Sequence, residues 1–169
     1  LDSFSSSGDY AGIQDTLTNT CYLVRHPQGD LVWDLGLPMA MVGTGPQTND
    51  VFTLTVERSL ADQLADIGLS TDEIEFISIS HSHFDHSGQA ALFSNSQWLV
   101  NQNEFAHMFA SPESSAQNAA FADLNKTIIN GDHDIFGDGS VTILDLPGHT
   151  PGHTALQVNL AQVGPILLT

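Results

Sequence analysis

The segment His81-Ser82-His83-Phe84-Asp85-His86 contains three of the chain's eight histidines and one aspartate within six residues. Imidazole and carboxylate groups are the usual protein ligands of zinc and similar divalent ions. Four such side chains this close together cannot readily point at one ion, so the spacing predicts two ions. On an extended backbone His81 and His83 lie on one side and share an ion, while Asp85 and His86 turn towards a second. The alternatives are a solvated polar loop and a mono-metal oxidoreductase site.

The residues on either side of this segment are expected to hold it on a rigid support. Residues 75–80 alternate apolar and polar side chains, which predicts a strand that ends at the segment. Residues 87–93 are expected to form a helix that begins beside it. A similar arrangement is predicted later in the chain, where a strand over residues 141–146 leads into Pro147-Gly148-His149-Thr150-Pro151-Gly152-His153. A histidine at a strand end, fixed by Pro and Gly on either side, is positioned like a ligand.

Composition and charge limit the class of protein. A chain of 169 residues with 41% apolar residues is predicted to form one globular domain, residues 1–169. Its 20 acidic residues against three Lys and Arg give a formal charge of -17, which argues against nucleic-acid and membrane partners. No apolar run approaches the ~20 residues of a membrane span. The single Cys21 excludes an internal disulfide and a Cys-based zinc site, and is expected to be buried.

The remaining pattern predicts a mixed α and β chain. Residues 21–26 and 31–34 are expected to pair as a hairpin. Val56, Leu60, Leu64 and Ile67 recur at helical spacing before Gly68, which predicts one amphipathic helix. Further helices are expected over residues 102–109 and 114–124, and further strands over residues 98–100, 127–129, 154–160 and 165–169.

The segment from His81 to His86 resembles the HxHxDH signature of the metallo-β-lactamase superfamily of hydrolases. The resemblance extends over residues 20–169 and is greatest to the N-acyl homoserine lactonase-like branch, because of Phe84 and the flanking residues 30–38 and 146–153. It implies an α+β fold, an αββα sandwich with a pair of zinc ions at one sheet edge.

The resemblance also implies roles for individual residues. His149 would join His81 and His83 as the third ligand of the first ion, with Asp85 and His86 left to the second. Asp34, at a strand end, would support the metal-binding segment by hydrogen bonding; an ordinary turn aspartate is the alternative. Residues 39–50 would lie over the mouth of the site, and we expect substrate contacts from Met41 and Phe84. A disordered surface loop is the alternative for residues 39–50.

The chain departs from the family pattern after its last predicted strand. Family members have a metal-bridging Asp just after a strand that resembles residues 165–169, and a final His later, whereas this chain stops at Thr169. We therefore expect a sandwich truncated at the C-terminus, whose second ion has two protein ligands. A noncatalytic fragment and completion by another chain are the alternatives. The compartment, cytoplasmic or periplasmic and secreted, and the oligomeric state, with a homodimer among the options, stay open.

The expected activity is hydrolysis of a small molecule. Two divalent ions lower the pKa of a water to give a metal-bound hydroxide and polarise the attacked carbonyl, while Asp85 orients the nucleophile and carries a proton to the leaving alkoxide. The resemblance to the lactonase-like branch implies an N-acyl homoserine lactone as substrate, and hence quorum quenching. A neutral lactone would also not be repelled by the acidic surface, and Met and Phe side chains near the mouth could accept its acyl chain. The alternatives are a glyoxalase-II-type thioesterase, whose anionic thiol conjugate calls for basic residues, and a noncatalytic metal-binding fragment.

Overall fold

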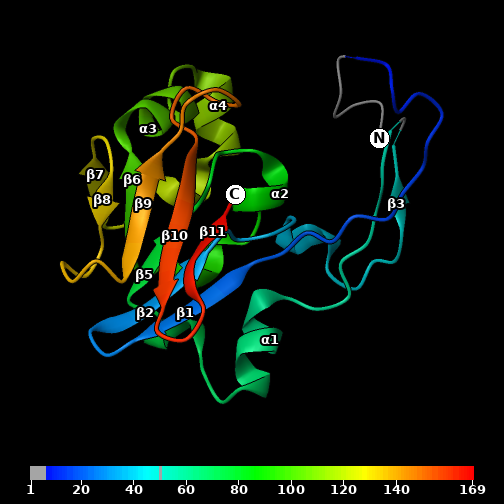
Figure 1. Ribbon diagram of the computed structural model, residues 1–169. Coiled ribbons are helices and arrows are strands. Elements are labelled where there is room, and N and C mark those ends of the chain that lie inside the picture. Colours follow the sequence, from blue (N-terminus) through cyan, green and yellow to red (C-terminus); the bar gives the residue numbers. More distant parts are fainter. Residues whose placement is uncertain (1–6, 50) are drawn as a thin grey trace.

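The computed structural model describes residues 7–49 and 51–169, in which two β-sheets face each other (Figure 1). The first sheet has the order β1-β2-β5-β6-β7, with β1 (Tyr22–His26), β2 (Gly29–Trp33), β5 (Phe76–Ser78), β6 (Gln97–Asn101) and β7 (Lys126–Ile129). The second has the order β11-β10-β9-β8, with β8 (His133–Asp134), β9 (Val141–Asp145), β10 (Thr154–Leu160) and β11 (Gly164–Leu168). A short hairpin of β3 (Gln47–Thr48) and β4 (Thr53–Leu54) stands apart from both sheets.

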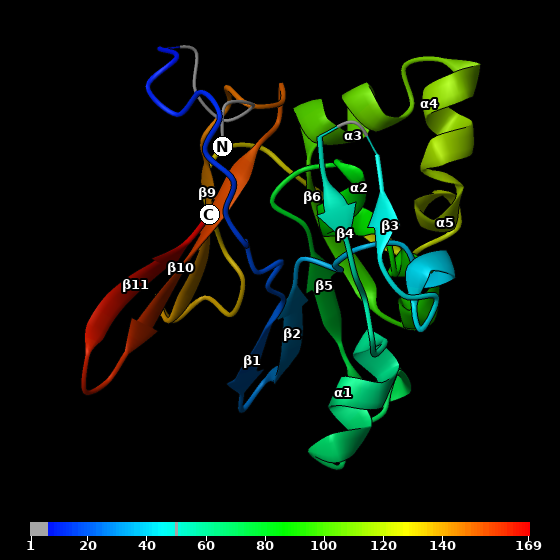
Figure 2. The same cartoon turned by 90° about the vertical axis from the view of Figure 1, so that its right-hand side faces the viewer.

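Helices cover one side of this pair of sheets. Figure 2 shows them beside the first sheet, with the second sheet on the opposite side: α1 (Leu60–Asp66), α2 (Phe84–Ser87), α3 (Gln102–Met108), α4 (Pro112–Gln117) and α5 (Ala119–Ala122). Among the described residues no helix lies on the outer face of the second sheet. The predicted α+β class is confirmed, and three layers of the expected αββα sandwich are present. None of the helices in the described ranges is long and apolar enough to cross a membrane.

The alternating side chains of β2 divide the core into two parts. Leu31 and Trp33 pack between the two sheets, while Val32 points to the helices, as the two-residue period of a strand requires. The cluster between the sheets comprises Leu31, Trp33, Leu99, Ile129, Val141, Ile143, Leu156 and Val158. Both faces of β2 are therefore buried, which is the usual condition of a strand in the parallel part of a sheet.

Three predicted helices are wrong in their boundaries. Val56 lies outside α1, because Ser59 and Asp62 form a capping box that begins the helix at Leu60. The helix expected over residues 87–93 instead begins inside the histidine segment as α2, and is followed by the 3-10 helix η4 (Ala90–Phe93). The helix expected over residues 114–124 is divided into α4 and α5 at Asn118.

The segment after Leu37 contains two short elements of regular structure at the surface. It contains the 3-10 helix η2 (Met39–Met41) and then β3. Asp50, at the end of the predicted segment, lies outside the described residues, as do residues 1–6. Residues 39–41 and 47–48 thus have regular structure, and the placement of the segment over the mouth of the site stays a prediction.

The sheet topology brings distant segments to one edge. Strands β2, β5 and β6 run parallel, so their carboxyl ends meet at the same edge of the first sheet. The segment between β9 and β10 reaches this edge from the second sheet, where Thr154 N donates to Ser80 O at 2.9 Å. This edge therefore holds Asp34, the histidine segment and His149 together.

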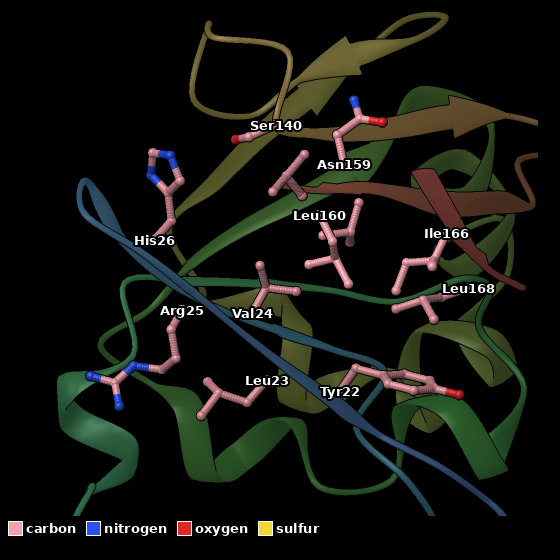
Figure 3. A pocket seen from close by; sticks show the side chains of 12 residues that line it. Tyr22, Leu23, Val24, Arg25, His26, Ser140, Asn159, Leu160, Ile166 and Leu168 are labelled. Carbon is pink, nitrogen blue, oxygen red and sulfur yellow. The ribbon is translucent and has the colours of Figure 1, made fainter. Parts of the chain in front are cut away.

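A cavity of about 290 Å³ opens elsewhere, where β1 faces β10 and β11 (Figure 3). Its apolar lining includes Tyr22, Val24, Leu160, Ile166 and Leu168, and its polar end includes His26 and Asn159. None of the clustered histidines lines it. The candidate site therefore lies elsewhere than this cavity, and it is identified from the clustered histidine side chains.

Gly88, which follows α2, is predicted to tolerate no side chain. A Cβ at Gly88 would lie 2.3 Å from Pro38 N and 2.4 Å from the carbonyl carbon of Leu37. Because these are backbone atoms, which cannot rotate away, we expect Gly88→Ala to lower the free energy of unfolding by about 3 kcal/mol. Urea unfolding monitored by tryptophan fluorescence measures this loss. Gly148→Ala is the control, because a Cβ at Gly148 meets nothing within 4 Å, and an equal loss in both variants would contradict the prediction.

The acidic surface predicts that salt stabilises the fold. In the part of the chain that the structure describes, Arg25 pairs with Asp30 and Arg58 with Asp66, while Lys126 donates to main-chain carbonyls. Most of the 20 acids in the sequence therefore lack a Lys or Arg partner. Raising NaCl from 0.01 M to 1 M shortens the screening length from about 30 Å to about 3 Å. We expect the free energy of unfolding to rise by about 1 kcal/mol, and Tm to rise by about 3 °C, as measured by calorimetry. An unchanged Tm would contradict the prediction.

Candidate metal centre

Three imidazoles from two distant segments meet at the sheet edge. His81 Nε2 lies 2.9 Å from His83 Nδ1, and His149 Nε2 lies 3.1 Å from the same nitrogen. The three ring centroids are 4.5 to 4.7 Å apart. One ligand nitrogen from each ring falls in a group whose members all lie within 4.8 Å of one another. The structure thus brings together the three residues that the sequence analysis assigned to the first ion.

The donor set and its spacing fit a divalent metal ion. With zinc–nitrogen distances of 2.0 to 2.1 Å and tetrahedral angles, two nitrogens on one ion lie about 3.4 Å apart. The separations of 2.9 and 3.1 Å in the cluster are about 0.5 and 0.3 Å shorter than this value, so a small outward movement of the rings would admit the ion. His81 is buried, whereas His83 and His149 are exposed. The cluster therefore has a fixed inner side and a side that a small molecule can reach.

The surroundings of His81 and His83 favour the neutral form of both imidazoles, which is the form that binds a metal ion. Burial and, to a smaller extent, the neighbouring histidines, of which His86 has the largest effect, together lower the pKa of His81 to about 3. The pKa of His83 is also lowered, first by burial and then by His149. Each of these neutral rings has one nitrogen with a free lone pair, which can bind a cation.

Asp85 and His86 lie together beside this cluster. Asp85 Oδ2 is 3.5 Å from His86 Nε2, and the rings of His86 and His81 have centroids 4.2 Å apart. Burial lowers the pKa of His86, but its hydrogen bonds to Asp34 and Asp85 outweigh burial and raise that pKa to about 9. The hydrogen bond to His86 lowers the pKa of Asp85. The two side chains predicted for the second ion are therefore adjacent to each other and to the first group.

Asp34 lies under the histidine segment in a backbone conformation that few residues adopt. It follows β2 with φ 60°, the one positive value among the described non-glycine residues, and is 3% exposed. Its Oδ1 accepts from Ser80 N at 2.7 Å, and its Oδ2 lies 2.9 Å from His86 Nδ1. Asp34 thus contacts both the main chain just after β5 and the ring of His86, while its role in supporting a metal site stays a prediction.

The two residues predicted to contact substrate lie on different elements. Phe84 is the first residue of α2, next to His83, and is 49% exposed. Met41 is the last residue of η2, which is joined to the end of α2 because Met39 N donates to Gly88 O at 3.2 Å. Phe84 is therefore adjacent to a residue of the histidine cluster, whereas η2 is joined to Gly88, and the contact of both side chains with substrate stays a prediction.

Two further histidines are separate from the ligand group. His153 Nδ1 lies 3.2 Å from Leu146 O, and its ring centroid is 5.4 Å from that of His81. His107 is an exposed residue of α3.

Cys21 is a free thiol that lies half-buried against the helix-side core. Burial, followed by the charge of Asp34, raises the pKa of this thiol to about 12. The thiol is thus protonated at neutral pH.

Sequence reasoning missed several residues that hold the site in place. Ser80 Oγ lies 3.0 Å from His81 Nδ1 and 3.1 Å from His86 Nδ1. Asn19 Nδ2 donates to Asp85 O at 2.9 Å. Glu104 accepts hydrogen bonds from both histidine-bearing segments. Its sequence context, Asn101-Gln102-Asn103-Glu104, is typical of a helix start with an exposed acid, so no local signal marked it.

Comparisons with known proteins show what the chain is similar to. Residues 15–164 match the model of the metallo-β-lactamase superfamily. An N-acyl homoserine lactonase of a Bacillus species is 30% identical over 95% of this chain and 69% of its own length. The N-acyl homoserine lactonase AiiA of Bacillus thuringiensis subsp. kurstaki is 31% identical over 88% of this chain and 61% of its own length.

A solved structure has a backbone similar to that of this chain. It is an N-acyl homoserine lactone hydrolase with the product N-hexanoyl-L-homoserine bound at its catalytic metal center, 29% identical to this chain. The two superpose with a TM-score of 0.73 over 87% of this chain and 60% of that one. The chain therefore spans between 60 and 69% of the length of these three proteins.

Proposed function

Because the chain belongs to the metallo-β-lactamase superfamily, we propose that its protein is a metal-dependent hydrolase that opens the ring of an N-acyl homoserine lactone. The observation that carries the proposal is the convergence of three imidazole nitrogens at an accessible sheet edge. Lactonases that are about 30% identical to the chain favour this substrate class over others that the superfamily's chemistry allows. Residues 1–169 would belong to one hydrolase domain.

In this proposal the two groups of side chains hold two zinc ions. His81, His83 and His149 would hold the first ion, and Asp85 and His86 the second. Bound divalent ions supply a water of lowered pKa and polarise the carbonyl under attack. Asp34 would keep the ring of His86 oriented, since its carboxylate accepts from His86 Nδ1 and leaves Nε2 directed towards Asp85.

Three side chains would act on the reacting molecules, Asp85 in addition to holding the second ion. The Asp85 carboxylate would take a proton from the attacking water and deliver it to the alkoxide that leaves when the ring opens. Phe84 and Met41 would contact the acyl chain, which is apolar. A neutral lactone can approach a chain with a formal charge of -17 without repulsion, whereas an anionic thioester cannot.

The test is hydrolysis of N-hexanoyl homoserine lactone, followed by acid release in a pH-stat. We expect turnover that disappears with a chelator and returns when zinc is added, and about two metal ions per chain by elemental analysis. S-lactoylglutathione serves as the competing substrate, because the thioesterase alternative requires it to be hydrolysed faster. Metal binding without turnover of either compound would favour a noncatalytic metal-binding protein.

A further inference from the structure

Glu104 is a buried acid at the edge where the histidine cluster lies. It is the third residue of α3, directly after β6, and is 1% exposed. Among the described residues no Lys or Arg forms an ion pair with it. A carboxylate in such a position is unfavourable unless its oxygens accept hydrogen bonds. The donors that supply them therefore show what the residue holds in place.

The two oxygens of Glu104 are divided between the two histidine-bearing segments. Oε1 accepts from the main-chain nitrogen of Ser82, the residue between His81 and His83, at 2.7 Å. Oε2 accepts from Thr150 Oγ1 at 2.6 Å and from Gly152 N at 3.1 Å. These two donors come from the segment that carries His149. One carboxylate thus joins segments that are more than sixty residues apart in the chain.

The second of these segments is also packed directly on Glu104. A Cβ at position 152 would lie 2.1 Å from Glu104 N and 2.7 Å from Glu104 Cα, so only glycine permits this approach. Thr150 is 4% exposed, and its hydroxyl is bonded to the carboxylate away from water. The position of His149 relative to His83 is therefore set where its segment meets the start of α3.

We propose that Glu104 is a positioning residue that sets the spacing between His149 and the pair of His81 and His83, and thereby the metal affinity of the cluster. The inference rests on the proposed metal site but not on the identity of the substrate. Glu104 does not touch the cluster's nitrogens; it acts through Ser82 on one side and Thr150 on the other. Loss of the hydrogen bond to Ser82 or to Thr150 would allow one segment to move relative to the other.

Glu104→Gln and a pair of Thr150 variants test the proposal. A glutamine keeps the size of the side chain, but its NH₂ group cannot accept a hydrogen bond, so one segment loses its acceptor. Thr150→Val removes the hydroxyl donor with little change in shape, whereas Thr150→Ser keeps it. Glu113→Gln makes the same change of charge at an exposed position of α4. Co²⁺ is the probe, because its visible spectrum reports the coordination geometry independently of turnover.

The dissociation constant for Co²⁺ is expected to rise about 10- to 100-fold in Glu104→Gln, with altered visible bands. Thr150→Val should shift both readouts in the same direction, and Thr150→Ser and Glu113→Gln should leave them close to wild type. If Glu104→Gln does not fold, the Thr150 pair decides the question. Urea unfolding of the metal-free proteins separates a loss of stability from a loss of affinity.

Two outcomes would overturn the proposal. The first is variants that are less stable but bind Co²⁺ with wild-type affinity and spectrum, since Glu104 would then serve the fold alone. The second is a wild-type protein that binds no Co²⁺, because the proposed metal site would then be refuted together with the role of Glu104. A wild-type protein that binds Co²⁺ but does not open lactones contradicts only the proposed function, and the comparison of variants then still supports or refutes positioning by Glu104.

Discussion

We expect His83→Ala to abolish lactone hydrolysis and metal binding while the two-sheet fold stays intact. His83 Nδ1 is the nitrogen that the other two members of the cluster approach, at 2.9 and 3.1 Å, so its loss leaves the remaining pair without a third ligand. His83 is exposed, and substitutions at exposed positions usually change stability by less than about 0.5 kcal/mol. The lactonase rate should fall by about 10³-fold or more, which corresponds to about 4 kcal/mol of activation free energy.

The matched control for this variant is His107→Ala. His107 is also exposed, but it lies on α3 outside the ligand group. Metal content by elemental analysis and far-UV circular dichroism are measured on both variants together with the rate. We expect wild-type metal content and turnover for His107→Ala. Unchanged hydrolysis or unchanged metal content in His83→Ala would refute the assignment of His83.

The positions of the clustered residues follow from two different kinds of sequence signal. His81 and His83 are separated by one residue after a strand, so local geometry alone puts their side chains on the same side. His149 is 66 residues beyond His83, and nothing local links the two. Its place was predicted because it follows a strand between Pro and Gly residues and because the resemblance matched it to a ligand. The structure brings it to the expected edge, and its binding of a metal stays a prediction.

The support of the site was harder to predict because it depends on contacts between distant segments. Asp34 was found through a strand-end motif, but Ser80 and Glu104 have side chains whose partners lie in other segments. An acid in the first turn of a helix is normally solvated, whereas here the segment of Thr150 and Gly152 packs on the start of α3 and contributes to the burial of Glu104. Likewise, α2 begins inside the histidine segment, since His83 takes the extended conformation of an N-cap residue. Neither feature has a signature in local sequence.

We expect Asp34→Ala to destabilise the fold and weaken metal binding together. The substitution leaves Ser80 N without its acceptor and His86 Nδ1 without its carboxylate partner, both in a buried region. The φ of 60° at this position is also energetically unfavourable for alanine. Breaking a buried charged pair costs about 3 kcal/mol or more, so Tm should fall by roughly 10 °C. Urea unfolding and calorimetry of the metal-free protein measure the loss, and elemental analysis gives the metal content.

Asp34→Asn separates the contribution of the backbone from that of the carboxylate. Asparagine tolerates positive φ, and its amide oxygen can still accept from Ser80 N, but its NH₂ group cannot accept from His86 Nδ1. We therefore expect Asp34→Asn to recover part of the stability lost in Asp34→Ala while metal content stays below that of wild type, because the ring of His86 is no longer held. An Asp34→Asn protein with wild-type metal content would mean that Asp34 supports only the end of β5, and the role assigned to it in orienting His86 would be wrong.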